Sequence, residues 1–316
     1  MRMCPREHAL AQLANLRRIG DHEALTQGST FHYALEHYYR VIQAHQQKLI
    51  ETSTAFGGTT PFSALSQTQR DLFVHGAVQE AEATAWEKIL PMRDEPGYLD
   101  TYDSLERMLA SYFDCYRRKD PWRILAVEEN LEFWVRDDAD DPLFGYTARL
   151  DLVVEDVEKR VTKIVEHKSA RTVTEDLIDG YQLDQQILGQ AWLFLNCVDL
   201  SKYAPFGGVD VNITTKHKLP RHERVAVLPS RYHLAAFQES ITHWNSLEKE
   251  FAARGWPKAL GNCAGPARYW SRCDFYNICH GMPEASVEDV KVLLEPPFGY
   301  RLATTEDLEL ESREDD

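Results

Sequence analysis

Apolar and polar residues alternate with a helical period in the first third of the chain. Apolar side chains three or four positions apart are Phe31, Leu35, Tyr38, Tyr39 and Ile42. This spacing predicts a helix over residues 28–48, which presents His32 and Glu36 one turn apart on one face. The same period returns over residues 66–90 and 98–117, so this part of the chain is predicted to be mainly helical.

Beyond Pro121 the pattern changes to short apolar runs rich in Val, Ile, Leu and aromatic residues, which are typical of strands. These runs cover residues 123–127, 131–135, 148–154, 161–167 and 209–215. The third and fourth runs flank a charged turn, residues 155–160, and therefore predict a hairpin. Helical spacing over residues 183–195 and 230–254 completes a mixed α/β pattern.

The pattern divides the chain into four regions. Residues 1–120 form a helical region that holds Cys4 and His32, and residues 121–215 form a strand-rich core. Residues 216–285 contain a long helix and a cysteine-rich segment. Residues 286–316 are acidic and have little apolar material to bury, so we expect a partly disordered tail.

Composition narrows the class of protein. Hydrophobic residues make up 43% and charged residues 27% of the 316 residues, which is enough apolar material for a sizeable core. No stretch has the roughly 18 consecutive apolar residues of a membrane helix, and the start of the chain lacks the apolar run of a signal peptide. We therefore expect a cytoplasmic protein with no membrane partner.

The net charge of −15 argues against a protein that coats nucleic acid non-specifically, because such proteins carry a broad basic surface. It does not exclude an enzyme that acts on DNA. Two short basic groups can either face a phosphate backbone or simply be solvated. They are Arg117, Arg118 and Lys119, and Lys216, His217, Lys218, Arg221 and Arg224.

Charged residues stand at three positions of the predicted hairpin. Glu166 and Lys168 are two residues apart on one strand and project from the same face, whereas His167 projects from the other. If Asp151 on the neighbouring strand faces the same way, two carboxylates and an ammonium converge. Divalent cations such as Mg²⁺ prefer carboxylate oxygens, and a lysine beside them can orient a water, so the group suits phosphodiester hydrolysis. The alternative is an exposed ion pair on a surface hairpin.

Six cysteines in a chain expected to stay in the reducing cytoplasm are more typical of metal binding than of disulfides. Cys263, Cys273 and Cys279 fall in one aromatic-rich segment, and Cys4 lies near the other end of the chain. Together they can complete a four-cysteine site, and their spacing leaves zinc and an iron–sulfur cluster nearly even. The other two cysteines, which we expect to be small buried hydrophobic residues, are Cys115 and Cys197.

Three motifs give the sequence a family resemblance. They are Gly28-Ser-Thr-Phe-His32-Tyr-Ala-Leu-Glu36, the stretch from Gly145 to Asp151, and Glu166-His167-Lys168. In this order they resemble the PD-(D/E)XK nuclease superfamily, in the branch of the RecB and AddB nuclease domains, the CRISPR adaptation nucleases and many phage exonucleases. The resemblance implies a restriction-endonuclease-like core, a mixed central sheet flanked by helices, with a helical N-terminal part and a C-terminal iron–sulfur segment.

The resemblance also implies a DNA nuclease, most simply an exonuclease, that depends on Mg²⁺ or Mn²⁺. Asp151 and Glu166 are expected to bind the metal, and His32 is carried over as a further ligand. The backbone carbonyl of His167 is expected to contribute as well, whereas its side chain is not.

Two further residues receive roles from this comparison. Lys168 is expected to orient the water or to stabilise charge. Gln186 lies in the register of a Gln-x-x-x-Tyr motif of the family, but Gln190 stands where the family has tyrosine. The amide of Gln186 can still orient a phosphate, a water or Lys168.

For the cysteines, the resemblance favours a four-iron four-sulfur cluster, because related nucleases hold one with one cysteine before the core and three after it. The ligands are then Cys4, Cys263, Cys273 and Cys279, with zinc as the alternative metal. DNA, as a single strand or a duplex end, is the expected partner, in recombination, repair or phage replication. The competing hypothesis is a DNA-binding or assembly subunit that keeps the cluster and has lost cleavage.

Overall fold

The computed structural model describes residues 4–13, 16–18, 23–53, 56, 65–94, 98–117, 119–257, 273, 275–281 and 300–302. The chain divides into two compact units. The larger unit consists of Glu23–Phe237 and Ser312–Asp316, and the smaller unit of Met1–His22 and Gln238–Glu311. Among the helices described, none is both long and apolar enough to cross a membrane.

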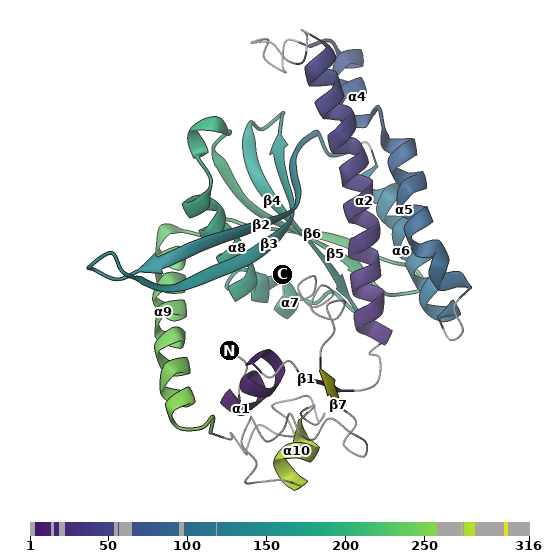
Figure 1. Cartoon of the computed structure of the whole chain (residues 1–316). Coiled ribbons are helices and arrows are strands. Elements are labelled where there is room, and N and C mark those ends of the chain that lie inside the picture. Colours follow the sequence, from purple (N-terminus) through teal and green to yellow (C-terminus); the bar gives the residue numbers. More distant parts are fainter. Residues whose placement is uncertain are drawn as a thin grey trace. The chain divides into compact units, whose positions relative to one another are not determined.

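A five-stranded sheet forms the centre of the larger unit (Figure 1). In the order in which they lie side by side, its strands are β2 (Trp122–Arg136), β3 (Pro142–Asp156), β4 (Val161–Ala170), β5 (Phe206–Thr215) and β6 (His222–Val227). Strands β4 and β5 are parallel, and the other neighbours are antiparallel. The sheet is therefore mixed, as expected for a PD-(D/E)XK core.

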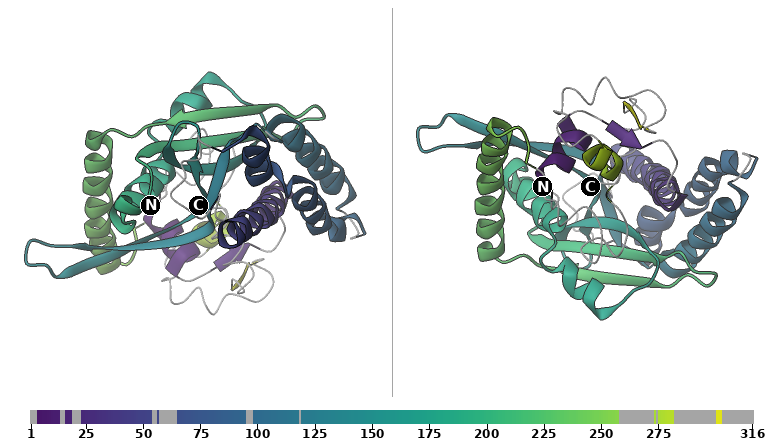
Figure 2. Two further views of the ribbon diagram at one scale, coloured as in Figure 1. Left: turned by 90° about the horizontal axis from the view of Figure 1, so that it is seen from above. Right: turned by 90° about the horizontal axis from the view of Figure 1, so that it is seen from below.

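Helices from the first part of the chain gather on one side of this sheet (Figures 1 and 2). They are α2 (Glu23–Thr52), α4 (Gln67–His75), α5 (Val78–Arg93) and α6 (Leu99–Tyr116). The predicted apolar stripe of α2, which includes Phe31 and Leu35, is buried in one cluster with Leu152 and Val165 of the sheet. Burial of this stripe fixes which face of α2 meets the strands, and His32 lies beside it.

Two helices, α7 (Glu175–Tyr181) and α8 (Gln185–Cys197), belong to a second core with the sheet. Ile187 and Phe194 of α8 pack in it with Val211 of β5. The carboxylate of Asp184 caps α8 by accepting hydrogen bonds from the backbone N–H groups of Gln186 and Ile187. Gln186 therefore stands in the first turn of a well-defined helix.

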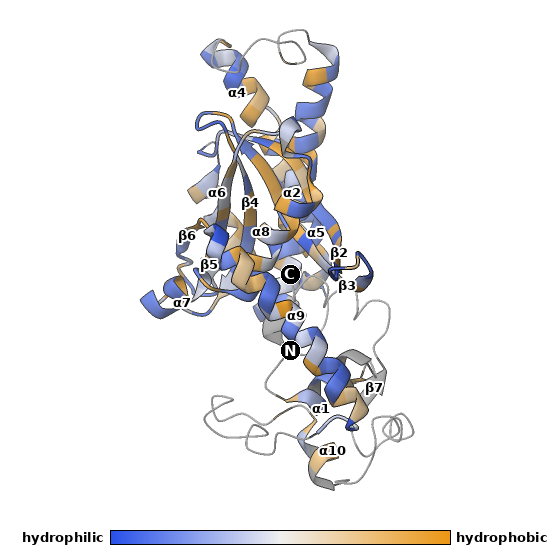
Figure 3. Cartoon of the chain, turned by 90° about the vertical axis from the view of Figure 1, so that its left-hand side faces the viewer, coloured by the Kyte–Doolittle hydropathy of each residue, from blue (hydrophilic) through white to orange (hydrophobic). Residues whose placement is uncertain are grey.

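A short 3-10 turn, Leu200–Lys202, precedes β5, and α9 (Arg231–Ala253) follows β6. Polar and apolar residues alternate along α9 (Figure 3). Of its described side chains, Phe237 is buried. Helix α9 begins in the larger unit and ends in the smaller one.

The smaller unit joins segments from both ends of the chain. It contains α1 (Pro5–His8), a π-helical turn (Ala9–Leu13), β1 (Leu16–Arg18), α10 (Tyr276–Gly281) and β7 (Tyr300–Leu302). Strands β1 and β7 pair antiparallel, and Leu10 and Leu16 share a buried cluster with Phe275 and Ile278. Residues near the N-terminus therefore pack with residues of the cysteine-rich segment.

Several predicted elements have different bounds in the structure. The runs 123–127 and 131–135 form one strand, β2, because its pairing with β3 continues through Glu129 and Asn130, which lie between them. The β2–β3 hairpin extends as a two-stranded ribbon beyond the rest of the sheet (Figure 1). The sequence did not predict β6, α7 or β7. Strand β7 lies within residues 286–316, where we expected a tail.

Candidate active site

The predicted catalytic residues lie where β3 and β4 part. Pairing between the two strands ends at Leu152 and Val165, and the next residues are Asp151 and Glu166. Strand β4 continues beside β5, so its other edge loses its strand partner at this point. The backbone N–H of His167 donates instead to Asp151 Oδ2 at 2.7 Å. At this fork, the point where β3 and β4 separate, the Asp151 carboxylate thus accepts a hydrogen bond from the backbone of the Glu-x-Lys motif.

Glu166 lies on the side of β4 that faces α8 and is completely buried. Its Oε1 is 2.7 Å from Lys168 Nζ, so the two side chains meet on one face as their spacing predicts. Gln186 Nε2 donates to Glu166 Oε1 at 3.1 Å, and Gln190 Nε2 donates to Glu166 Oε2 at 2.8 Å. Lys168 Nζ also donates to Gln186 Oε1 at 2.6 Å. Gln186 therefore holds the ammonium and the carboxylate together.

Gln190 lies one helical turn beyond Gln186 on α8. Its side chain is fully buried and binds Glu166 directly, so it belongs to the support of this carboxylate. It also donates to the backbone carbonyl of Arg149 at 3.3 Å. Gln190 is thus a positioning residue between β3 and β4.

The histidines stand on the other side of Asp151. His32 Nδ1 of α2 lies 3.6 Å from Asp151 Oδ2. The His167 ring is buried, with Nδ1 3.5 Å from the same oxygen and Nε2 3.0 Å from the Tyr112 hydroxyl. The Tyr112 hydroxyl in turn lies 2.7 Å from that of Tyr39. The His167 ring, which was not expected to bind the metal, therefore lies against Asp151.

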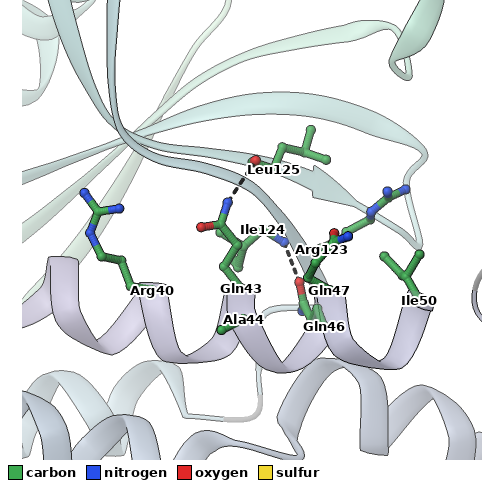
Figure 4. Close-up of a pocket in the computed structure, with 9 residues that line it drawn as sticks. All are labelled: Arg40, Gln43, Ala44, Gln46, Gln47, Ile50, Arg123, Ile124 and Leu125. Carbon is green, nitrogen blue, oxygen red and sulfur yellow. Dashed lines mark hydrogen bonds between the residues drawn. The ribbon is translucent and has the colours of Figure 1, made fainter. Parts of the chain in front are cut away.

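Helix α2 is tied to β2 by amide hydrogen bonds, which fix the height of His32 above the sheet. Gln43 Nε2 donates to the Leu125 carbonyl at 3.0 Å, and the Ile124 N–H donates to Gln46 Oε1 at 2.7 Å (Figure 4). These contacts lie beside a surface hollow of about 340 Å³ between the helix and the strand. The hollow contains none of the predicted catalytic residues.

Charge and burial set the protonation of Asp151 and His32. Burial alone raises the pKa of Asp151, but the adjacent His32 and the hydrogen bonds from His167 outweigh it and lower the pKa to about 2. Burial lowers the pKa of His32 to about 4 despite the charge of Asp151. Near neutral pH the site therefore presents an ionised carboxylate and a neutral imidazole.

The second carboxylate behaves in the opposite way. Burial, followed by the charge of Asp151, raises the pKa of Glu166 to about 8. Burial lowers the pKa of Lys168, but the contact with Glu166 outweighs this and raises it. Asp151 and Glu166 are thus close enough to disfavour a second negative charge, which is the electrostatic setting of a cation site.

We expect the free energy of unfolding of the metal-free protein to fall as the pH rises from about 6.5 to about 8.5. The pKa of Glu166 is about 8 in the folded chain and 4.5 ordinarily, so in this range the folded chain binds a proton that the unfolded chain has released. His32 does not contribute here, because its folded pKa of about 4 confines its effect to lower pH.

Glu166→Gln is the matched variant, since it removes the titrating group and keeps an acceptor for Lys168. Its unfolding free energy should change less over the same pH range. Urea denaturation in chelator-treated buffer measures both proteins. Equal pH slopes contradict a protonated, buried Glu166.

The sequence did not reveal the ion pair behind Asp151. Glu128 of β2 has a left-handed backbone (φ 53°), and its Oε2 lies 2.6 Å from Arg149 Nε. Both side chains are largely buried. A cavity of about 10 Å³, roughly the space of one water molecule, lies beside Glu128. Its polar lining residues are His32, Glu36, Tyr39, Glu128, Asp151 and His167.

The basic residues that the sequence analysis grouped into two short runs have different surroundings in the structure. Arg224 donates twice to Asp120 and stacks on Tyr116 and Trp122, so it is a structural residue rather than a phosphate contact. Arg117 pairs with Glu82 at 2.6 Å. Arg118 lies outside the described residues.

Among the cysteines, Cys4 and Cys273 are 3% and 5% exposed, and Cys279 is half-buried. Cys263 lies outside the described residues. The expectation that Cys115 and Cys197 are buried was wrong, because Cys115 is half-buried and Cys197 is exposed. Within the described part of the chain, no three histidine, cysteine, aspartate or glutamate side chains form a ready metal site.

A sequence model described as the PD-(D/E)XK nuclease superfamily matches residues 1–280. The match spans the helix of His32, the fork between β3 and β4, and the cysteine-rich segment. Comparisons with curated proteins and with solved structures give no match.

Proposed function

The chain belongs to the PD-(D/E)XK nuclease superfamily, whose members are generally nucleases, and from this premise we propose that it is a metal-dependent DNA exonuclease of the RecB-like branch. One observation carries the proposal. At the fork of β3 and β4 an ionised Asp151, a buried Glu166 and the ammonium of Lys168 stand together. Three such ionisable groups at one point of an apolar sheet are costly unless they serve chemistry.

The donor set suits a divalent cation. Carboxylate and carbonyl oxygens are the ligands of Mg²⁺ and Mn²⁺, and a cation relieves the repulsion from Asp151 that, after burial, raises the pKa of Glu166. The water-sized cavity beside Asp151 and His32 has further carboxylates, Glu36 and Glu128, in its lining. We assign Asp151, Glu166 and the carbonyl of His167 as ligands.

His32 is proposed as the additional ligand. Its low pKa keeps the imidazole neutral, which is the form that binds metals. A nitrogen ligand suits a transition metal better than Mg²⁺, so Mn²⁺ is expected to support the higher activity. When bound, the cation supplies a Lewis acid for the scissile phosphate and lowers the pKa of a water.

The protein's own groups then orient the reaction. Lys168 stays charged and is held by Glu166 and Gln186, so its ammonium can direct a water and offset the charge that develops on the phosphate. Gln186 fixes this ammonium, and Gln190 fixes Glu166. Preorganisation of this kind lowers the barrier without movement at the moment of reaction.

Gln186→Leu should lower kcat/KM by about 10- to 100-fold, a range typical of groups that orient metal-site residues. The loss should fall mainly on kcat, because Gln186 positions Lys168 and Glu166 rather than the bulk of the DNA.

The matched control is Gln182→Leu, an exposed glutamine four residues earlier in the chain. Steady-state cleavage of a short labelled duplex measures both variants. A loss confined to KM, or an equal loss in the control, contradicts the positioning role.

Exonuclease action is tested with two DNA molecules of the same sequence, one linear and one covalently closed. The proposal expects degradation of the linear molecule with Mn²⁺ and persistence of the closed one. Comparable cleavage of both overturns the requirement for an end. A requirement for ends connects the protein with recombination, repair or phage replication.

The second part of the proposal is a four-iron four-sulfur cluster on Cys4, Cys263, Cys273 and Cys279. The burial of Cys4 and Cys273 supports it, as does the membership of Met1–His22 and Gln238–Glu311 in one unit. The buried apolar cluster of the smaller unit, among its described residues, is small. A metal cross-link stabilises such a unit by joining distant segments. Zinc is the alternative metal.

A further inference from the structure

The loop between β5 and β6, residues 216–221, stands at the end of the sheet that carries Lys168. In the parallel pair β4–β5, Lys168 is opposite Ile213 and Ala170 is opposite Thr215. The N–H of Lys216 continues this pairing by donating to the Ala170 carbonyl at 2.9 Å. The loop therefore starts three residues beyond the level of Lys168.

The base of this loop is fixed from both sides. Thr215 N–H donates to the Arg221 carbonyl at 3.0 Å, and Arg221 N–H donates to Thr215 Oγ1 at 2.8 Å. Ser111 Oγ of α6 lies 2.7 Å from His222 Nε2 and 3.4 Å from the Pro220 carbonyl oxygen. These contacts close the loop, so the side chains at its tip project from a rigid base.

The amino-acid composition of the loop suits the binding of DNA. Its six residues are Lys216, His217, Lys218, Leu219, Pro220 and Arg221, with no acidic residue among them although the whole chain carries −15. Leu219 is 85% exposed, more than the other exposed large hydrophobic side chains described. An apolar residue fixed between basic ones is the arrangement of a wedge that enters between bases while cations hold the phosphates.

The loop also reaches back toward the catalytic strand. A Cβ placed on Gly28 of α2 would lie 3.3 Å from Ser169 Oγ and 4.0 Å from Lys216 Nζ. The Lys216 amine therefore lies near the residue that follows Lys168. Three residues of strand span about 10 Å, and a DNA strand advances about 3.4 Å for each nucleotide, so the loop stands roughly three nucleotides from the reacting bond.

We propose that the 216–221 loop grips the DNA end. Lys218 and Arg221 hold phosphates about three nucleotides from the bond that is cleaved, and Leu219 packs against the terminal base pair of a duplex and keeps it open. This inference rests on the proposed nuclease function and adds to it the element that prepares a duplex end for cleavage.

The phosphate contacts are tested by fluorescence anisotropy with chelator present, over salt concentrations from about 50 to 200 mM. Between these two salt concentrations, each phosphate contact contributes about a 3.5-fold change in the affinity for DNA. A variant that lacks one contact loses this part of the salt dependence. Lys218→Ala with Arg221→Ala should therefore flatten the salt dependence of binding. Lys202→Ala, an exposed lysine that precedes the other end of β5, is the control and should keep the slope of the unaltered chain.

The wedge is tested with 2-aminopurine in the terminal pair of a blunt duplex. The unaltered chain should raise its fluorescence, and Leu219→Ala should not. Leu219→Ala should also slow cleavage of blunt duplexes while leaving cleavage of single strands unchanged. The control is Leu228→Ala, since Leu228 is exposed at the far end of β6.

An unchanged salt slope in the double variant overturns the phosphate contacts, and equal behaviour of Leu219→Ala and Leu228→Ala overturns the wedge. These outcomes leave the nuclease assignment intact. Failure of the unaltered chain to bind or cleave any DNA overturns the proposed function and, with it, the role of the loop.

Discussion

Asp151→Asn and Glu166→Gln are each expected to lower kcat/KM for DNA cleavage by about a thousandfold or more, which corresponds to about 4 kcal/mol of transition-state stabilisation. Each change removes one of the proposed carboxylate ligands while it keeps the size of the side chain. The amide oxygen that each change leaves can still accept, from the His167 N–H in the first variant and from Lys168 in the second, so the fold should survive. Lys168→Ala should cause a comparable loss, because the ammonium that directs the water disappears.

The control for these variants is Asp156→Asn, a buried carboxylate at the other end of β3. It should retain activity and fold normally by circular dichroism. The His32→Ala variant should also cleave DNA much more slowly. High Mn²⁺ should restore part of its activity if the imidazole contributes only to the affinity for the metal. Near-normal cleavage by either carboxylate variant contradicts the assignment of the site.

Serine at Cys4, Cys263, Cys273 or Cys279 is expected to bleach the visible absorption of anaerobically purified protein and to lower the free energy of unfolding. The ligands come from opposite ends of the chain, so one cluster closes a very long loop and restricts the unfolded state. By analogy with the loss of a structural disulfide, the cost is about 2–5 kcal/mol. Thermal unfolding followed beside the absorption spectrum measures both effects.

Cys115→Ser and Cys197→Ser are the matched controls and should keep the colour, because both cysteines lie in the larger unit. Iron, sulfide and zinc analysis completes the experiment. Stoichiometric zinc without iron contradicts the cluster and leaves the nuclease assignment standing. Colour that survives serine at any of the four positions removes that cysteine from the ligand set.

The local pattern of the sequence was sufficient to predict much of the fold and part of the candidate site. The helical period of α2 gave the position of His32, and the period of β4 put Glu166 and Lys168 on one face. The spacing of Gln186 from the strand was also informative, since its amide meets both Glu166 and Lys168. Each of these features repeats over a few residues and needs no distant partner.

Features that depend on distant partners were missed. Strand β6 is short and half polar, and it is defined by pairing with β5. The left-handed Glu128 pairs with Arg149 of the neighbouring strand, a contact that no local period marks. Arg224 looked like part of a basic run, but Asp120, far away in sequence, neutralises it. A signal for Glu128 existed in the charged residues within an otherwise strand-like run.

The central claim is that the fork of β3 and β4 hydrolyses DNA with a divalent cation, and one assay tests it most directly. End-labelled single-stranded and duplex DNA are incubated with the purified chain and with Glu166→Gln, in Mn²⁺ or in chelator. The account predicts shortened products only for the unaltered chain with Mn²⁺. Intact DNA in every lane, despite binding, indicates a non-cleaving subunit, and cleavage by Glu166→Gln or in chelator contradicts the account.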